Sequence, residues 1–118
     1  MEIFQRFDLE CARRLPRLPQ EHPCARLHGH SFRVEIRVAG SLDSDLGWVV
    51  DFADIRTAWQ AVHDALDHRC LNDVPGLENP TTEHLARWIW ARLKPALPGI
   101  SLIQVMETAN SGCRYRGD

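Results

Sequence analysis

Lysine is nearly absent from this chain of 118 residues, and so are paired cysteines and long apolar runs. Lys94 is the only lysine, so arginine supplies almost all of the positive charge. The net charge is −2, and no basic run or basic face with interleaved aromatic residues indicates a nucleic-acid partner. No apolar stretch approaches the roughly 20 residues that a membrane-spanning helix needs. We therefore expect neither nucleic acid nor a membrane as a partner.

The four cysteines are scattered, without the short spacing of a metal-binding or redox pair: Cys11, Cys24, Cys70 and Cys113. This spacing disfavours a structural zinc domain, which is usually rich in cysteine and has four protein ligands. The chain also begins without a basic segment followed by an apolar run, so we expect no signal peptide. These features predict reduced thiols in the cytoplasm.

The order of the predicted elements indicates an α+β fold in one domain, residues 1–118. Hydrophobic periodicity and capping residues predict strands over 1–10, 31–39, 100–107 and 113–116, and helices beginning after Asp51 and Thr81. Two pairs of strands with the helices grouped between them fit a four-stranded antiparallel sheet with both helices on one face. Such a sheet has two open edges, and we expect a homo-oligomer that covers them.

A loop of some length is predicted from Cys11 to the second strand, because Pro16, Pro19 and Pro23 interrupt regular structure. It also carries Arg13, Arg14, Arg17, His22 and Cys24. Long loops in compact domains tend to be functional. Farther along, Trp48 to Val50 is predicted to be a short extended piece that leads into the first helix.

Two histidines stand at the start of the second strand, close to a cysteine. In Cys24-x-x-x-His28-Gly29-His30, both imidazoles have the same parity as Phe32 and the apolar residues after it, so they point to one face. A His-x-His pair on a strand can direct two nitrogens at one metal ion. In the alternative interpretation, one histidine is a buried core residue and the other lies on the surface. The nearby thiol favours metal binding or catalysis.

Two further positions carry groups suited to chemistry. Asp67 and His68 follow the first helix, where the carboxylate can set the tautomer of the imidazole, although a solvated helix end has the same pattern. Glu107 ends an apolar strand, where it is either solvated or free to bind the amino-amidine edge of a pterin or guanine.

A series of short markers runs along the chain in fixed order and spacing: Arg14-Leu15-Pro16, Cys24-x-x-x-His28-Gly29-His30, Gly47-Trp48-Val49-Val50-Asp51-Phe52, Leu66-Asp67-His68, Leu71-Asn72, Asn79-Pro80-Thr81-Thr82-Glu83 and Glu107-Thr108. Together they resemble the 6-pyruvoyltetrahydropterin synthase superfamily over essentially the whole chain. The three-residue gap between Cys24 and His28 is similar to the branch that forms 6-carboxytetrahydropterin in the queuosine pathway.

The resemblance implies the tunnelling fold, in which the sheets of several subunits join into a barrel, commonly in hexamers with sites between subunits. It implies conversion of 7,8-dihydroneopterin triphosphate to 6-carboxytetrahydropterin, with release of acetaldehyde and triphosphate. In the implied site, Cys24 is the general base, Asp67 and His68 transfer protons, and Glu107 with Thr108 binds the pterin. Two alternatives stay open: a lyase that forms 6-pyruvoyltetrahydropterin, and a non-catalytic pterin-binding module.

The resemblance also implies a catalytic zinc ion on His28 and His30, but this chain departs from the family pattern at the third ligand. Family members of this type carry a histidine where this chain has Arg13, and a guanidinium has no lone pair to offer a metal. Either His22 or the thiolate of Cys24 replaces the ligand, or Arg13 itself supplies the positive charge. We expect zinc to persist with a substitute ligand and name His22 as the third residue.

Overall fold

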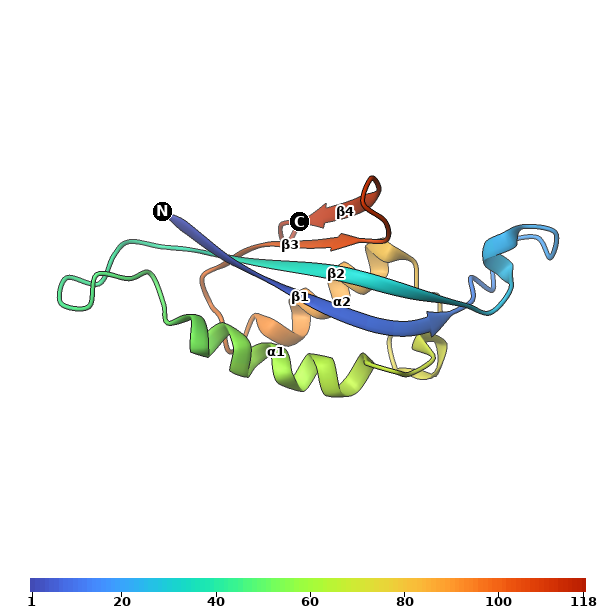
Figure 1. Ribbon diagram of the computed structural model, residues 1–118, viewed down its shortest axis with the longest axis horizontal. Helices are drawn as coiled ribbons and strands as arrows, with labels where there is room; N and C mark the ends of the chain where they lie inside the picture. Colours follow the sequence, from blue (N-terminus) through green and yellow to red (C-terminus); the bar gives the residue numbers. More distant parts are fainter.

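The computed structural model describes residues 1–118, which form one four-stranded antiparallel sheet with two α-helices on one face (Figure 1). In chain order the elements are β1 (Glu2–Arg13), the 3-10 helix η1 (Pro23–Ala25), β2 (His28–Ala39), α1 (Phe52–Leu66), the 3-10 helix η2 (Leu71–Asp73), α2 (Thr82–Leu93), β3 (Ile100–Met106) and β4 (Gly112–Tyr115). The strands lie side by side in the order β1-β2-β3-β4. The predicted α+β fold, a four-stranded antiparallel sheet with both helices on one face, is confirmed. Neither α-helix is long and apolar enough to cross a membrane.

Strand β1 is longer than the sequence predicted, because it continues through Arg13 instead of ending at Glu10. The prediction of a loop beginning at Cys11 was therefore wrong. Cys11 pairs with His30 and Arg13 pairs with His28, so the start of β2 extends the ladder. On the other side, the N–H of Ala12 donates to the carbonyl of Arg69 at 2.9 Å. These partners are distant in the sequence and keep the segment extended.

Both helices begin where their capping residues predicted. The Asp51 carboxylate accepts a hydrogen bond from the N–H of Ala53 at 2.8 Å, and the Thr81 hydroxyl accepts one from His84 at 3.2 Å. Such caps satisfy backbone donors that the first helical turn leaves free. Before α1, however, residues 48–50 are bends, so the predicted extended piece is not a strand.

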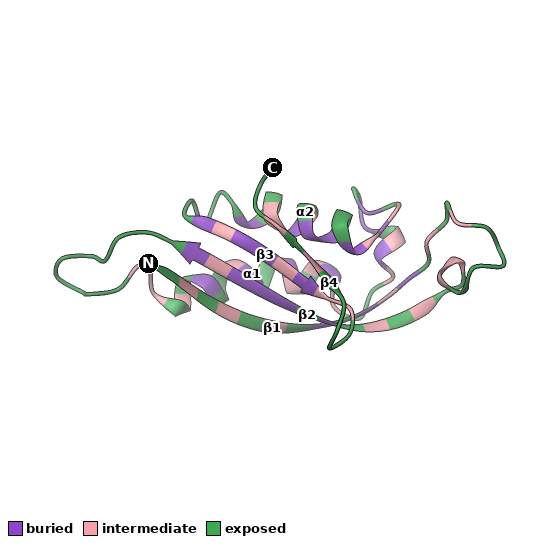
Figure 2. Cartoon of the chain, turned by 90° about the horizontal axis from the view of Figure 1, so that it is seen from above, coloured by how far each residue is buried: buried purple, intermediate pink, exposed green.

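The apolar core lies between the helices and one face of the sheet. Figure 2 shows burial alternating along the strands, as expected when one face of a sheet is covered. The fully buried side chains at the centre include Leu9, Phe32, Ile36, Ile55, Ile89 and Ile103.

The opposite face of the sheet is polar and carries ion pairs between its side chains. Glu35 is nearly fully buried there, and its two carboxylate oxygens accept hydrogen bonds from Arg6 at 2.8 Å and Arg37 at 2.6 Å. Two forked donors on one carboxylate offset the cost of removing Glu35 from water. The sheet thus carries apolar contacts on one face and paired charges on the other.

We predict that Ile89→Ala lowers the free energy of unfolding by about 2–5 kcal/mol, because it removes buried methyl groups between α2 and the sheet. Urea denaturation at a fixed protein concentration measures this loss. Arg87→Ala, an exposed change on the same helix, should stay within about 0.5 kcal/mol of the parent. Equal losses in both variants would contradict the packing of α2.

Candidate functional site

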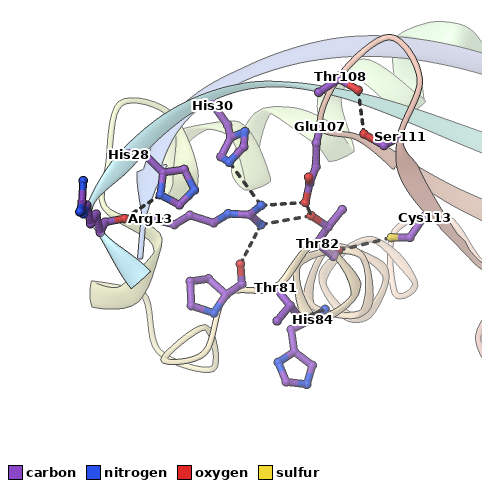
Figure 3. Close-up of polar contacts among 12 residues, drawn as sticks. Arg13, His28, His30, Thr81, Thr82, His84, Glu107, Thr108, Ser111 and Cys113 are labelled. Carbon is purple, nitrogen blue, oxygen red and sulfur yellow. Dashed lines mark hydrogen bonds and ion pairs between the residues drawn. The ribbon is translucent and has the colours of Figure 1, made fainter. Parts of the chain in front are cut away.

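Four elements meet at the end of the sheet where β1 ends and β2 begins. Figure 3 shows that Arg13, the last residue of β1, points toward His30 of β2, Glu107 just after β3, and the start of α2. The guanidinium is the centre of this cluster, and Arg13 is only 2% exposed. Arginine keeps its charge in proteins, so the site contains a permanent buried cation.

The guanidinium is held by hydrogen bonds on both of its terminal nitrogens. Nη1 donates to the carbonyl oxygen of Pro80 at 3.0 Å and to the hydroxyl of Thr82 at 3.1 Å. Nη2 donates to Oε1 of Glu107 at 2.7 Å and also faces Nε2 of His30 at 3.3 Å. These contacts connect β1 with the beginning of α2 and with the turn after β3.

His28 presents a free imidazole nitrogen to the same region. Its Nδ1 lies 2.7 Å from the carbonyl oxygen of Arg26, which can only accept, so Nδ1 carries a proton. The Nε2 atom is buried and has no hydrogen-bond partner in the chain. The rings of His28 and His30 meet edge to face, with centroids 4.7 Å apart. Both histidines therefore face one site, as the strand parity predicted.

His30 is neutral in this arrangement. A guanidinium can only donate, so Nε2 of His30 accepts from Arg13 through its lone pair. Burial, the charge of Arg13 and the neighbouring His28 all lower the pKa of His30. Its lone pair is therefore already used by the guanidinium.

Glu107 is ionised and partly open to solvent. Burial acts to raise its pKa, but hydrogen bonds from Thr82 and Arg13 and the charge of Arg13 outweigh burial, so the pKa lies below its usual value. Oε1 accepts from both Arg13 and the Thr82 hydroxyl. Oε2 has no hydrogen bond within the chain, and about a third of the side chain is exposed, 31%. One carboxylate oxygen is thus available to a ligand.

Asp67 and His68 form a second polar pair just after α1. Oδ2 of Asp67 lies 2.5 Å from Nδ1 of His68, while Oδ1 accepts from the backbone N–H of Glu10 at 3.0 Å. Hydrogen bonds from that N–H and from His68 lower the pKa of Asp67. The ionised carboxylate therefore accepts a hydrogen bond from Nδ1–H, and Nε2 of His68 makes no hydrogen bond within the chain. The His68 side chain is 78% exposed.

The backbone at His68 is left-handed, with φ at +58°. A non-glycine residue rarely takes this conformation, and such outliers are common at functional sites. The N–H of His68 donates to the carbonyl of Glu10 at 2.6 Å, which holds the segment against the edge of β1. A cavity of about 450 Å³ there is lined by residues that include both His30 and His68.

Cys24 stands apart from these groups within one chain. It lies in η1, and no hydrogen bond connects it with Asp67 or His68. Two other thiols are poor candidates, because burial raises the pKa of Cys11 to about 12 and also raises that of Cys113. Thr108 lies in the turn after β3, where its hydroxyl is 2.7 Å from that of Ser111.

The residues present do not fit a three-ligand zinc site. No group of three or more His, Cys, Asp or Glu side chains in this chain could hold a metal ion. The imidazole of His22 caps η1 instead, where its Nδ1 accepts from the N–H of Cys24 at 3.1 Å. His28 offers a suitable lone pair, but Arg13 occupies the lone pair of His30.

Sequence reasoning missed how Pro80 and Thr82 contribute to the site. The marker Asn79-Pro80-Thr81-Thr82-Glu83 was interpreted as a helix start and as part of the family pattern, with no role in the site. A carbonyl before that helix and a hydroxyl in its first turn nevertheless bind the Arg13 guanidinium. No local sequence signal indicates this contact, because the burial of Thr82 becomes apparent only in the folded chain.

Comparison with known proteins gives consistent matches over the whole chain. The family model described as 6-pyruvoyl tetrahydropterin synthase matches residues 2–118. The 6-carboxy-5,6,7,8-tetrahydropterin synthase of Synechocystis sp. is 42% identical over 119 residues, which cover 96% of this chain and 91% of that protein. The 6-pyruvoyl tetrahydrobiopterin synthase of Homo sapiens is 36% identical over 97 residues, covering 77% of this chain and 67% of that protein.

A solved structure supports the fold. The 6-pyruvoyl tetrahydropterin synthase of Caenorhabditis elegans superposes with a TM-score of 0.92 at 23% identity, covering 100% of this chain and 96% of that one. At this identity the likeness is evidence for the architecture alone.

We predict that ionised Glu107 raises the free energy of unfolding and that this stabilisation is lost when acid protonates the carboxylate. Its folded pKa is lower than its unfolded value of about 4.5, so the contribution is complete above that pH and is lost as pH falls through the folded pKa. The difference in unfolding free energy between the parent and Glu107→Gln should therefore shrink on acidification below about pH 4.5. Urea denaturation across this range measures it.

Glu21→Gln is the matched control, because Glu21 is exposed and makes no ion pair within the chain. Its difference from the parent should stay constant over the same range. A constant difference for Glu107→Gln as well would show that the pair with Arg13 does not stabilise the fold.

Proposed function

The chain belongs to the 6-pyruvoyl tetrahydropterin synthase family, and from that premise we propose that it is a carbon–carbon lyase acting on a pterin triphosphate. The reaction converts 7,8-dihydroneopterin triphosphate to 6-carboxytetrahydropterin, acetaldehyde and triphosphate, a step of queuosine biosynthesis. The observation that carries this proposal is the 42% identity to a 6-carboxytetrahydropterin synthase along nearly the full length of both chains.

Glu107 is the proposed anchor for the pterin ring. Its Oε1 is fixed by Arg13 and Thr82, while Oε2 has no partner in the chain. An ionised carboxylate oxygen accepts hydrogen bonds from the N–H groups of a pterin, and such charge-assisted bonds are stronger than neutral ones. Thr108, the next residue, is proposed to line the same end of the ring.

Cys24, Asp67 and His68 are the proposed proton-transfer groups. The exposed side chain of His68 is proposed to accept a proton at Nε2, with Asp67 supporting the charge that then forms on the imidazole. Cys24 is the proposed general base at the substrate side chain. Because Cys24 does not meet the pair within one chain, we propose that two copies of the chain complete each site.

A homo-oligomer, with a hexamer as the family precedent, is part of the proposal. The outer edge of β1 before Glu10 and the outer edge of β4 have no strand partner, and open edges tend to pair. Large apolar side chains are also exposed near the ends of the sheet and would be covered in an assembly: Leu27, Leu42, Leu46, Trp48 and Phe52. Joining the sheets into a barrel would cover the edges.

Zinc remains a prediction from the resemblance, with His28 and His30 as ligands and His22 as the substitute for the usual third histidine. The residues present do not fit it, because Arg13 fills the third position and His22 is used elsewhere. No step of the proposed mechanism is therefore assigned to a metal. A cytoplasmic location is also proposed, and the four free thiols are consistent with a reducing compartment.

A second candidate is a lyase that forms 6-pyruvoyltetrahydropterin. The 36% identity to the human 6-pyruvoyl tetrahydrobiopterin synthase favours it. A third is a pterin-binding module without turnover, which the arginine in the site favours. Chromatographic identification of the product separates them: the first proposal gives 6-carboxytetrahydropterin, the second a different pterin, and the third none.

We predict that Cys24→Ala lowers turnover of dihydroneopterin triphosphate by roughly 100-fold or more, the scale of a lost general base, with little change in pterin affinity. Single-turnover assays and a fluorescence titration with the pterin measure the two quantities. Cys113→Ala removes another partly buried thiol and serves as the control. Turnover at the parental rate in Cys24→Ala would remove Cys24 from the mechanism.

We also predict that Glu107→Ala weakens pterin binding by about 10- to 100-fold, because a charge-assisted hydrogen bond is lost. The same titration measures the dissociation constant. Glu83→Ala changes an exposed carboxylate in the first turn of α2 and should leave affinity unchanged. Equal affinities for all three proteins would show that the pterin does not bind at Glu107.

A further inference from the structure

We propose that the Arg13 guanidinium is the resident cation of this site, and that His28 and His30 therefore hold no divalent metal ion in this chain. The inference goes beyond the proposed function and does not depend on which reaction the protein catalyses. It rests on where the guanidinium lies, what holds it there, and which nitrogen lone pairs remain.

The guanidinium lies on the same face of the sheet as the two imidazoles. Arg13 pairs with His28 across the two strands, so both side chains point to the helix-covered face, as does His30 two residues later. Nη2 is 3.3 Å from Nε2 of His30. A metal on His30 would need the lone pair that the guanidinium now occupies.

A divalent cation at this position would also lie beside a fixed positive charge. Arg13 is buried, and like charges repel more strongly where water is excluded. The single carboxylate in the cluster, that of Glu107, is already paired with the Arg13 guanidinium at 2.7 Å. No other acidic side chain forms a metal-binding group with these histidines.

The guanidinium cannot leave without breaking several contacts. It donates to the Pro80 carbonyl and the Thr82 hydroxyl, and it stacks over the Phe32 ring with 5.1 Å to the centroid. Displacing it would leave these acceptors and Oε1 of Glu107 short of a donor. The polar groups of the cluster therefore surround an organic cation, the Arg13 guanidinium.

In this arrangement the charge and the hydrogen bond of Arg13 keep Glu107 ionised and oriented. The end of the sheet where β1 ends stays assembled when divalent ions are removed, since Arg13 connects it through hydrogen bonds to the Pro80 carbonyl and the Thr82 hydroxyl and through an ion pair with Glu107. A chelator should consequently leave both the fold and the ligand-binding geometry unchanged.

The test compares the parent protein with Arg13→His, which removes the charge and places an imidazole opposite His28 on the same face. Both are treated with EDTA, incubated with Co²⁺, desalted and analysed by metal content and visible absorption. We expect the parent to retain no stoichiometric cobalt and Arg13→His to bind about one ion per chain with a d–d spectrum typical of nitrogen ligands.

Arg13→Leu is the matched control, because it removes the charge without adding a ligand atom and should remain metal-free. Arg13→His combined with His30→Ala should lose the ion that the single variant gains. Circular dichroism verifies that each variant folds. If Arg13→His does not fold, zinc content of the parent purified without chelator, with and without His28→Ala, decides the matter.

The proposal would be overturned if the parent binds about one metal ion per chain and the His28→Ala variant loses that ion. A folded Arg13→His that binds no cobalt would overturn it too, because the guanidinium would then not be what excludes the metal. An ion that persists in the His28→Ala, His30→Ala double variant lies elsewhere and leaves the proposal standing. A product assay on the same parent sample keeps the questions separate, since a metal-free protein without turnover contradicts only the proposed function.

Discussion

The buried guanidinium of Arg13 is the constraint around which this end of the molecule is built. A charge removed from water is tolerated only where hydrogen bonds and an opposite charge compensate it. Its compensation comes from two separate parts of the chain: the start of α2, with the carbonyl of Pro80 and the hydroxyl of Thr82, and the turn after β3, with the carboxylate of Glu107. The position of α2 relative to the sheet therefore determines the geometry of Glu107, because Thr82 and Arg13 share the same carboxylate oxygen.

Local patterns in the sequence were sufficient to predict much of the fold. Alternating parity placed His28 and His30 on the core face, and the caps at Asp51 and Thr81 located both helices. The extension of β1 through Arg13 could not be predicted in this way. It depends on pairing with β2 and with the chain near Arg69, and a sequence window around Pro16 contains neither partner.

The candidate site was predicted as a set of residue types but not as an arrangement. Arg13 was interpreted as a departure from a ligand pattern, whereas its partners lie 67 and 94 residues away in the chain. Contacts of that separation follow from tertiary packing. The same limit applies to Cys24, whose place in η1 is separate from the Asp67–His68 pair in a single chain.

The unbroken register between β1 and β2 has a consequence for how such a chain can vary in length. Each residue from Glu2 to Arg13 is matched with one from His28 to Ala39, without a bulge. Inserting one residue inside β1 would reverse every side chain beyond it and turn the guanidinium to the polar face. An insertion inside β2 would put His28 and His30 on the opposite face from the core residues that follow them. In the part of the chain that ends at α1, insertions and deletions that preserve function should therefore be confined to the connections at 14–27 and 40–51. Related sequences can diverge in size there while the spacing between core and site stays constant.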